Sequence, residues 1–171
     1  MASIEILDNC LAPEKEIFIK YKGPNPWGIA KKIAGLQRPF FHVSSTNAGW
    51  TRLNWDKSGE NIDFFSLWWV KKPVSDYTGM RFDIKVQGSQ NKSTKDGHFN
   101  LTFTSNMTTK FGGWGIFLKP LWYIYSYLYY DKVRRSALDR CREYSLGFMN
   151  EIKEHFGLKT TTYGPSVTTL D

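Results

Sequence analysis

The side chains best suited to metal or cofactor chemistry are few and widely separated in this sequence. His42, His98 and His155 match no metal-ligand spacing such as His-Glu-x-x-His. The glycines at residues 112–115 lack the spacing of a phosphate-binding loop or a dinucleotide fingerprint, and they better suit a turn between a strand and a helix. We therefore expect neither a metal site nor a cofactor.

An isolated acid or base is the remaining catalytic hypothesis. His42 follows Phe40 and Phe41, and an ionisable group in an apolar cavity has a perturbed pKa and can polarise a carbonyl. His42 is thus the candidate catalytic residue, although a buried histidine with satisfied hydrogen bonds is the plainer interpretation. Arg52 and Asp83 fall on the polar side of alternating segments, where contact with solvent explains them.

The two cysteines, Cys10 and Cys141, are not expected to pair. Cys10 lies in an N-terminal segment with little periodicity, and Cys141 lies in a predicted helix, so a disulfide is improbable. Residues 1–10 (MASIEILDNC) have neither the basic region nor the apolar region of a signal peptide. We accordingly expect a cytoplasmic protein.

Aromatic residues are the compositional anomaly. The 171 residues include 12 Phe, 9 Tyr and 7 Trp, and the formal net charge is +7. The aromatic excess indicates a large cavity or an interface, and the positive charge favours anionic partners in general. With 41% hydrophobic and 23% charged residues, the chain has the composition of one globular domain, which excludes a mainly disordered protein.

Periodicity predicts a sheet followed by a long helix. Alternating residues predict six strands joined by short turns: 14–22, 40–45, 50–56, 64–71, 80–87 and 97–109. Residues 4–6 also alternate and predict a further edge strand. Asn25 and Pro26 open a short helix that Pro39 closes. Residues 119–156 predict a helix whose apolar stripe follows steps of three and four.

This order predicts an α+β fold. A curved antiparallel sheet of about six or seven strands grips a long C-terminal helix, and a short helix follows the first strand. We divide the chain into an N-terminal extension (1–13), a single domain (14–157) and a C-terminal tail (158–171).

Three features resemble the helix-grip superfamily, which includes START-type lipid-transfer domains, pollen-allergen-like ligand carriers and polyketide cyclases. They are the element order, the Gly-Pro-Asn-Pro-Trp junction at residues 23–27, and residues 117–158 (FLKPLWYIYSYLYYDKVRRSALDRCREYSLGFMNEIKEHFGL). The last segment is similar to the terminal helix of archaeal and bacterial cyclase/dehydrase-like members. The resemblance implies a deep apolar cavity between sheet and terminal helix that holds a lipid, quinone or polyketide-like molecule. The aromatic segment 114–130 departs from the family's pattern.

The expected ligand-binding residues combine the apolar faces predicted by periodicity with the cavity that the resemblance implies. They are apolar side chains of the sheet and the terminal helix, with tyrosine, serine and cysteine as polar or polarisable partners: Trp55, Trp68, Phe82, Ile84, Phe99, Leu101, Phe103, Tyr123, Tyr127, Leu138, Cys141, Tyr144, Ser145, Phe148 and Ile152.

Three function classes follow. We expect binding or carriage of an apolar or amphipathic small molecule. The first alternative is a cofactor-free cyclase or dehydratase that uses His42. The second is an interaction module for a membrane surface or nucleic acid.

Residues 114–130 contain Lys119 and Pro120 and are too short to span a bilayer, but their Trp and Tyr side chains suit transient contact with a membrane surface. The net charge and the aromatic residues of an antiparallel sheet favour nucleic acid. Against it, the terminal helix needs the sheet's apolar face. The sequence leaves the oligomeric state open.

Overall fold

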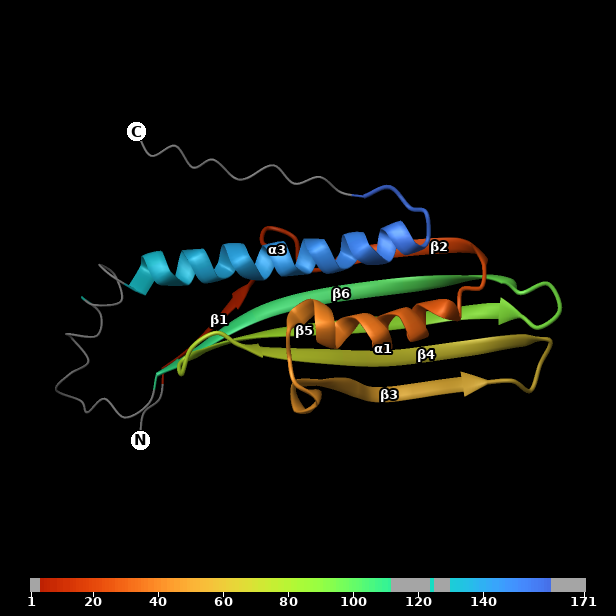
Figure 1. Ribbon diagram of the computed structural model, residues 1–171, viewed down its shortest axis with the longest axis horizontal. Helices are drawn as coiled ribbons and strands as arrows, with labels where there is room; N and C mark the ends of the chain where they lie inside the picture. The colour runs from red at the N-terminus through yellow and green to blue at the C-terminus, as the bar shows by residue number, and fades with distance from the viewer. Residues whose placement is uncertain (1–3, 112–123, 125–129, 161–171) are drawn as a thin grey trace.

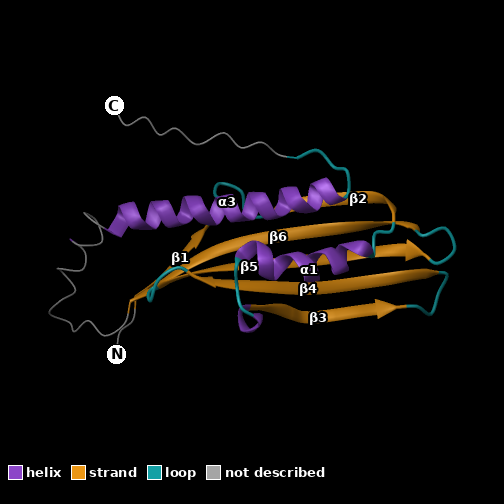
Figure 2. Cartoon of the chain, viewed as in Figure 1, coloured by secondary structure: helices purple, strands orange, loops and turns teal. Residues whose placement is uncertain are grey.

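The computed structural model describes residues 4–111, 124 and 130–160, which form one curved antiparallel sheet with two helices on one face (Figures 1 and 2). In chain order the elements are β1 (Ile4–Asn9), β2 (Ile17–Pro24), α1 (Gly28–Phe41), the 3₁₀ turn η1 (Ser45–Asn47), β3 (Ala48–Asp56), β4 (Asn61–Pro73), β5 (Thr78–Asn91), β6 (Asp96–Phe111) and α3 (Asp131–His155). The predicted α+β fold is confirmed, and the architecture is compatible with a helix-grip protein.

The sheet has the strand order β1-β6-β5-β4-β3, and β2 also pairs with β6. β1 lies along residues 106–111 of β6, and β2 lies along residues 96–103, so the two strands share one edge of the sheet (Figure 1). β3 is the opposite edge, and the sheet stays open. The N-terminal extension therefore contributes a strand, as the alternation of Ile4 and Ile6 indicated.

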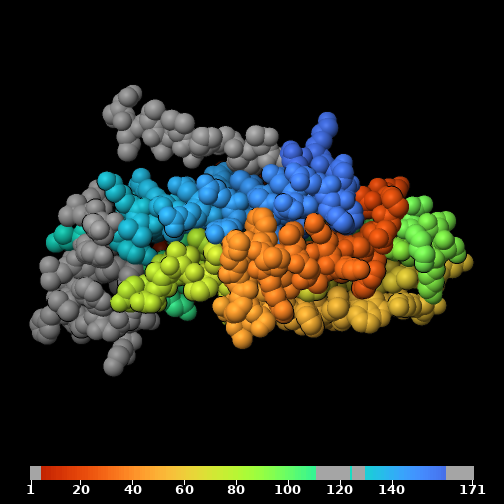
Figure 3. All heavy atoms as spheres, viewed as in Figure 1, coloured from red at the N-terminus to blue at the C-terminus, as the bar shows by residue number. Residues whose placement is uncertain are grey.

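Strand register separates the side chains into two faces. Trp68 pairs with Ile84, and Ile84 pairs with Phe103, so buried residues of β4, β5 and β6 align on the side that faces the helices. In these central strands the intervening residues are exposed or half-buried. We call the helix-covered side the inner face and the other side the outer face. The space-filling view shows α1 and α3 next to each other over the inner face (Figure 3).

The short helix α1 extends further than the sequence predicted. Pro39 lies inside its last turn, where it removes only one helical hydrogen bond, and the helix continues to Phe41. The strand predicted at residues 40–45 is therefore wrong. Phe41 is fully buried with its ring 4.5 Å from that of Phe82, and this packing holds the segment in the helix.

The terminal helix α3 follows the predicted stripe. Its buried residues include Cys141, Ser145, Phe148 and Ile152, and Gly157 adopts the left-handed conformation that ends many helices. Of the predicted first part of this helix, only Ile124 and Tyr130 belong to the described residues. Neither α1 nor α3, the helices of the described part of the chain, is both long and apolar enough to cross a bilayer.

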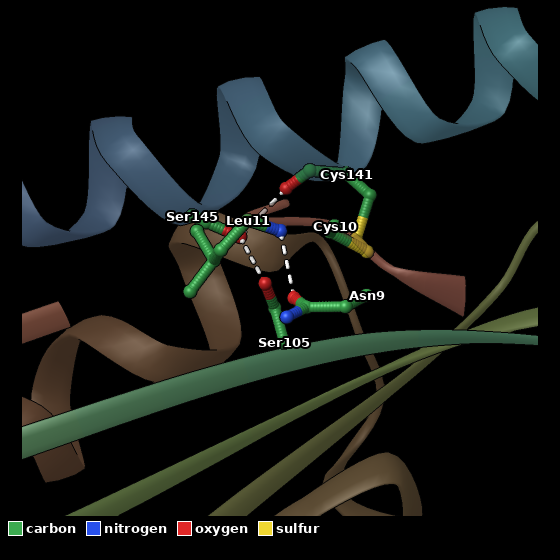
Figure 4. The surroundings of a disulfide bond; sticks show 6 residues. All are labelled: Asn9, Cys10, Leu11, Ser105, Cys141 and Ser145. Atoms are coloured by element: carbon green, nitrogen blue, oxygen red, sulfur yellow. Dashed lines mark hydrogen bonds between the residues drawn. A yellow bond between two sulfur atoms is a disulfide. The ribbon is translucent and has the colours of Figure 1, made fainter. Parts of the chain in front are cut away.

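Cys10 and Cys141 form a disulfide, which corrects the sequence prediction (Figure 4). β1 pairs with β6, and the Cys10 N–H donates to the Ser105 carbonyl oxygen, which places Cys10 directly under α3. Two alternating isoleucines, Ile4 and Ile6, were the only pattern that indicated β1, so the proximity of Cys10 to α3 was not predictable from periodicity. Disulfides persist most readily outside a reducing cytosol, and the cytoplasmic location stays a prediction.

A second tie joins the same two elements. The guanidinium of Arg134 on α3 donates two hydrogen bonds to the carboxylate of Asp8 on β1. Hydrogen bonding to Asp8 is the main reason that the pKa of Arg134 is raised above its ordinary value. The disulfide and this ion pair together fix the first half of α3 on the sheet.

Candidate functional site

The expected ligand wall forms a dense aromatic interior. Phe82 lies 6.1 Å from Phe103 and Phe103 lies 5.8 Å from Phe148, measured between ring centroids. Phe41 of α1 lies 5.1 Å from Phe148. The predicted residues that the structure buries and brings together come from β4, β5, β6 and α3: Trp68, Phe82, Ile84, Phe99, Leu101, Phe103, Cys141, Ser145, Phe148 and Ile152. At these positions the side chains pack against one another.

Two of these residues have partners that the sequence did not reveal. Cys141 is bonded to Cys10. The Ser145 hydroxyl lies 2.7 Å from the Cys141 carbonyl oxygen and 2.9 Å from Ser105 Oγ, within the fully buried layer between α3 and β6 (Figure 4). Both side chains therefore contribute to attaching α3 to the sheet.

The other predicted ligand residues are more peripheral. Trp55 lies at the β3 edge and is 53% exposed, with its ring 6.2 Å from that of Trp27. Leu138 and Tyr144 are half-buried on α3. Tyr123 and Tyr127 lie outside the described residues.

His42 is exposed at the C-terminal end of α1, where it has a left-handed backbone conformation. The expectation that His42 is buried is therefore wrong. The reason is that α1 extends through Phe41, so the Phe41 side chain points into the core. His42 is the next residue, and it caps the C-terminal end of the helix at the surface. A catalytic role for His42 stays a prediction. Its exposed position does not favour that role, because the hypothesis placed His42 in an apolar cavity.

Three buried polar atoms, one on α1 and two on β4, are a feature that the sequence analysis missed. Among the described residues, Gln37 Oε1, Ser66 Oγ and Trp68 Nε1 have no hydrogen-bond partner. Gln37 is 2% exposed and follows Ile33 by one helical turn, so an amide on the apolar stripe was the available signal. Buried polar groups of this kind are commonly satisfied by ordered water or by a ligand.

A groove lies along the seam between β2 and α3. Its volume is about 440 Å³, within the usual range for small-molecule sites. The segment just before β2 contributes charged side chains, β2 contributes apolar ones, and α3 contributes both kinds: Glu14, Glu16, Ile17, Phe18, Leu146, Met149, Asn150 and Lys153. Periodicity did not single out this groove, because its residues lie beside the inner face at an edge of the sheet.

The groove combines an apolar floor with charged side chains around it. Met149 is 1% exposed, whereas Ile17 and Leu146 are half-buried. Glu14 and Lys153 come from the two sides of the seam. This arrangement suits a molecule with an apolar body and a polar end.

Comparisons with known proteins add no family to this description. No protein-family model matches the chain, and no curated protein matches it in sequence. Within the described residues, His, Cys, Asp and Glu side chains form no group of three that is able to hold a metal ion. The geometry of the described residues is therefore the basis for assigning a function.

Proposed function

We propose that this chain is a helix-grip-type carrier that binds an amphipathic small molecule in the groove between β2 and α3. The observation that carries the proposal is a hollow of about 440 Å³ at the seam of sheet and terminal helix. A helix-grip protein holds its ligand between these same two elements.

The packed interior lies directly behind this groove. Ile17, on the groove side of β2, pairs in register with Phe103, whose ring packs on Phe148. Met149 follows Phe148 on α3 and lines the groove. A ligand in the groove would thus rest on a framework that is already ordered, which reduces the entropic cost of binding.

The groove residues indicate a ligand with two chemically different parts. Leu146, Met149 and Ile17 would contact an apolar body, and burying one leucine-sized surface contributes roughly 1.5–3 kcal/mol. Glu14, Glu16 and Lys153 would face its polar end. That the interior aromatic residues contact the ligand directly stays a prediction from the sequence.

The first experiment is native mass spectrometry of gently purified protein, followed by organic extraction of any bound molecule. We expect a stoichiometric adduct that releases a lipid, quinone or polyketide-like compound. A titration with N-phenyl-1-naphthylamine, a neutral amphipathic fluorophore, then locates the site.

Leu146→Gln is the test variant and Val133→Gln the control, because both replace an aliphatic residue of α3 by an amide. Val133 is 51% exposed and lies outside the groove lining. We expect Leu146→Gln to weaken binding of the fluorophore at least tenfold and Val133→Gln to leave it unchanged. Equal affinities in the two variants, or an unliganded protein that also fails to bind the fluorophore, would refute the proposal.

A further inference from the structure

The outer face of the sheet carries a row of large apolar side chains along β4. Phe65, Leu67 and Trp69 alternate with the buried residues of this strand, and all three are half-buried. Among the described residues, both helices pack on the inner face, and none of the described elements covers this row. A soluble sheet normally carries polar side chains on such a face, so the row requires a partner or a function.

Cationic side chains flank the row on both sides. Leu67 pairs in register with Arg52 of β3 and with Lys85 of β5. The Arg52 guanidinium and the Lys85 ammonium each lie 5.8 Å from the centre of the Phe65 ring. Lys71 continues the row, with its ammonium 5.4 Å from the Trp69 ring.

The two rings of the row suit bases that are not adjacent in a nucleic-acid strand. Phe65 and Trp69 lie four positions apart on β4, which is about 13 Å and roughly four times the 3.4 Å repeat along one nucleic-acid strand. Bases stack on aromatic rings without regard to sequence, and phosphates pair with neighbouring lysine and arginine. Phe65 and Trp69 supply the rings, and the flanking cations supply the charge.

One acidic residue of this face lies beside the row, because Asp83 pairs in register with Trp69, and two more lie at one end of the row. Asp83 is paired with Arg81 at 2.9 Å, so these two charges compensate each other. Asp56 and Asp63 pair across the strands at the far end of β3 and β4. Their carboxylates would repel phosphate there, which limits the positive stretch to the part of β4 between Phe65 and Lys71.

We propose that the outer face binds single-stranded RNA along β4, with bases on Phe65 and Trp69 and phosphates on Arg52, Lys71 and Lys85. This function is separate from the small-molecule groove. An antiparallel sheet with helices on one face and aromatic side chains on the other is an established platform for single-stranded RNA. The apolar side chains are half-buried among cations rather than protruding, which favours flat stacking over insertion into a membrane.

The choice of RNA over DNA rests on the strands beyond β4 in the sheet, where β5 is the direct neighbour and β6 follows it. Outer-face positions of β6 carry uncharged hydrogen-bonding side chains, among them Asn100, Thr102 and Thr104. Such groups can donate to or accept from a ribose 2′-hydroxyl, the group that distinguishes RNA from DNA. An RNA strand is therefore expected to bind more tightly than the corresponding DNA strand.

The test is fluorescence anisotropy with a labelled twelve-residue oligouridylate, measured over a series of salt concentrations. In Lys71→Gln/Lys85→Gln, two proposed phosphate contacts are lost, so affinity should fall at least tenfold and the salt dependence should become shallower. Lys132→Gln/Arg140→Gln is the matched control, since it removes the same net charge from exposed positions of α3. The control should lose less than threefold.

A second variant tests stacking. Phe65→Leu keeps an apolar side chain but removes the ring, and affinity should fall at least threefold at every salt concentration. Oligothymidylate should bind at least threefold more weakly than oligouridylate.

The proposal is overturned if the two charge variants lose affinity equally, if Phe65→Leu binds like the parent protein, or if RNA and DNA bind alike. Binding to vesicles of anionic phospholipid without saturable binding to RNA would instead identify a membrane surface.

Discussion

Trp68 and Trp69 are adjacent in sequence but lie on opposite faces of β4. Trp68 is 4% exposed and packs on the inner face, with its ring 5.9 Å from that of Trp50. Trp69 is half-buried on the outer face, where Lys71 lies over its ring. The comparison teaches that the aromatic residues in the described part of the chain serve both a packed interior and a cation-flanked surface.

The two faces also differ in what holds their side chains. The inner face is closed by α1 and α3 through ring contacts, a disulfide and the Arg134–Asp8 ion pair. On the outer face, the aromatic rings of β4 contact cations of the sheet itself. We therefore expect substitutions on the inner face to change stability and substitutions on the outer face to change binding.

The largest expected effect is on the covalent tie of the inner face. Cys10→Ala/Cys141→Ala removes a link between residues 131 positions apart. The chain-entropy model gives a loss of about 5 kcal/mol in the free energy of unfolding. Urea unfolding of the variant and of the oxidised parent protein measures the loss, and parent protein in reducing agent, which should unfold like the variant, is the control. A loss below 1 kcal/mol would show that the disulfide does not stabilise this fold.

A pair of phenylalanines compares the faces directly. Phe148→Ala should cost about 3–5 kcal/mol, because Phe148 is fully buried and its truncation leaves a cavity. Phe65→Ala on the outer face should cost less than about 1 kcal/mol. Urea unfolding of both variants measures the two losses in the free energy of unfolding. Similar costs, or a small cost at Phe148, would indicate a loosely packed interior that is open to ligand.

The ion pair between Asp8 and Arg134 has an intermediate expected effect. Asp8→Asn removes a carboxylate that is 13% exposed and accepts two hydrogen bonds, which should cost about 1.5–3 kcal/mol. Glu5→Gln is the control, because the Glu5–Lys110 pair is exposed and worth about 0.5 kcal/mol or less. If the two variants unfold at the same urea concentration, the Asp8–Arg134 ion pair contributes no more to the free energy of unfolding than the exposed Glu5–Lys110 pair.

The smallest expected effect concerns Gln37 on α1, whose buried amide oxygen has no hydrogen-bond partner. Gln37→Leu replaces a buried polar group by an apolar one of similar size, and stability should stay the same or rise by up to about 1 kcal/mol. Thermal unfolding measures the change. A loss above 1 kcal/mol would mean that Gln37 binds an ordered water or a ligand group in solution.

The sequence predicted the periodic parts of this structure well. Alternation along β5 and β6 and the stripe on α3 repeat over several turns or residue pairs, and each long pattern has one solution that buries its apolar side. Segments whose structure depends on distant partners were harder. Phe40 and Phe41 look like the start of a strand, yet contacts with Phe82 and Phe148 place them in α1.

The candidate site was less predictable than the fold for the same reason. The disulfide depends on β1 pairing with β6, and the groove depends on how closely α3 approaches β2. Neither distance is encoded by local periodicity. The outer row of β4 was visible in the segment Phe-Phe-Ser-Leu-Trp-Trp, but only register shows that Arg52 and Lys85 flank it.

The most direct test of the division between faces uses protein labelled with 5-fluorotryptophan, observed by fluorine NMR during titration with oligouridylate. Trp68→Phe and Trp69→Phe variants assign the two signals. We predict that the Trp69 resonance shifts or broadens in a saturable way while the Trp68 resonance stays in place. A response at Trp68, or none at Trp69, would contradict the assignment of the inner face to folding and the outer face to binding.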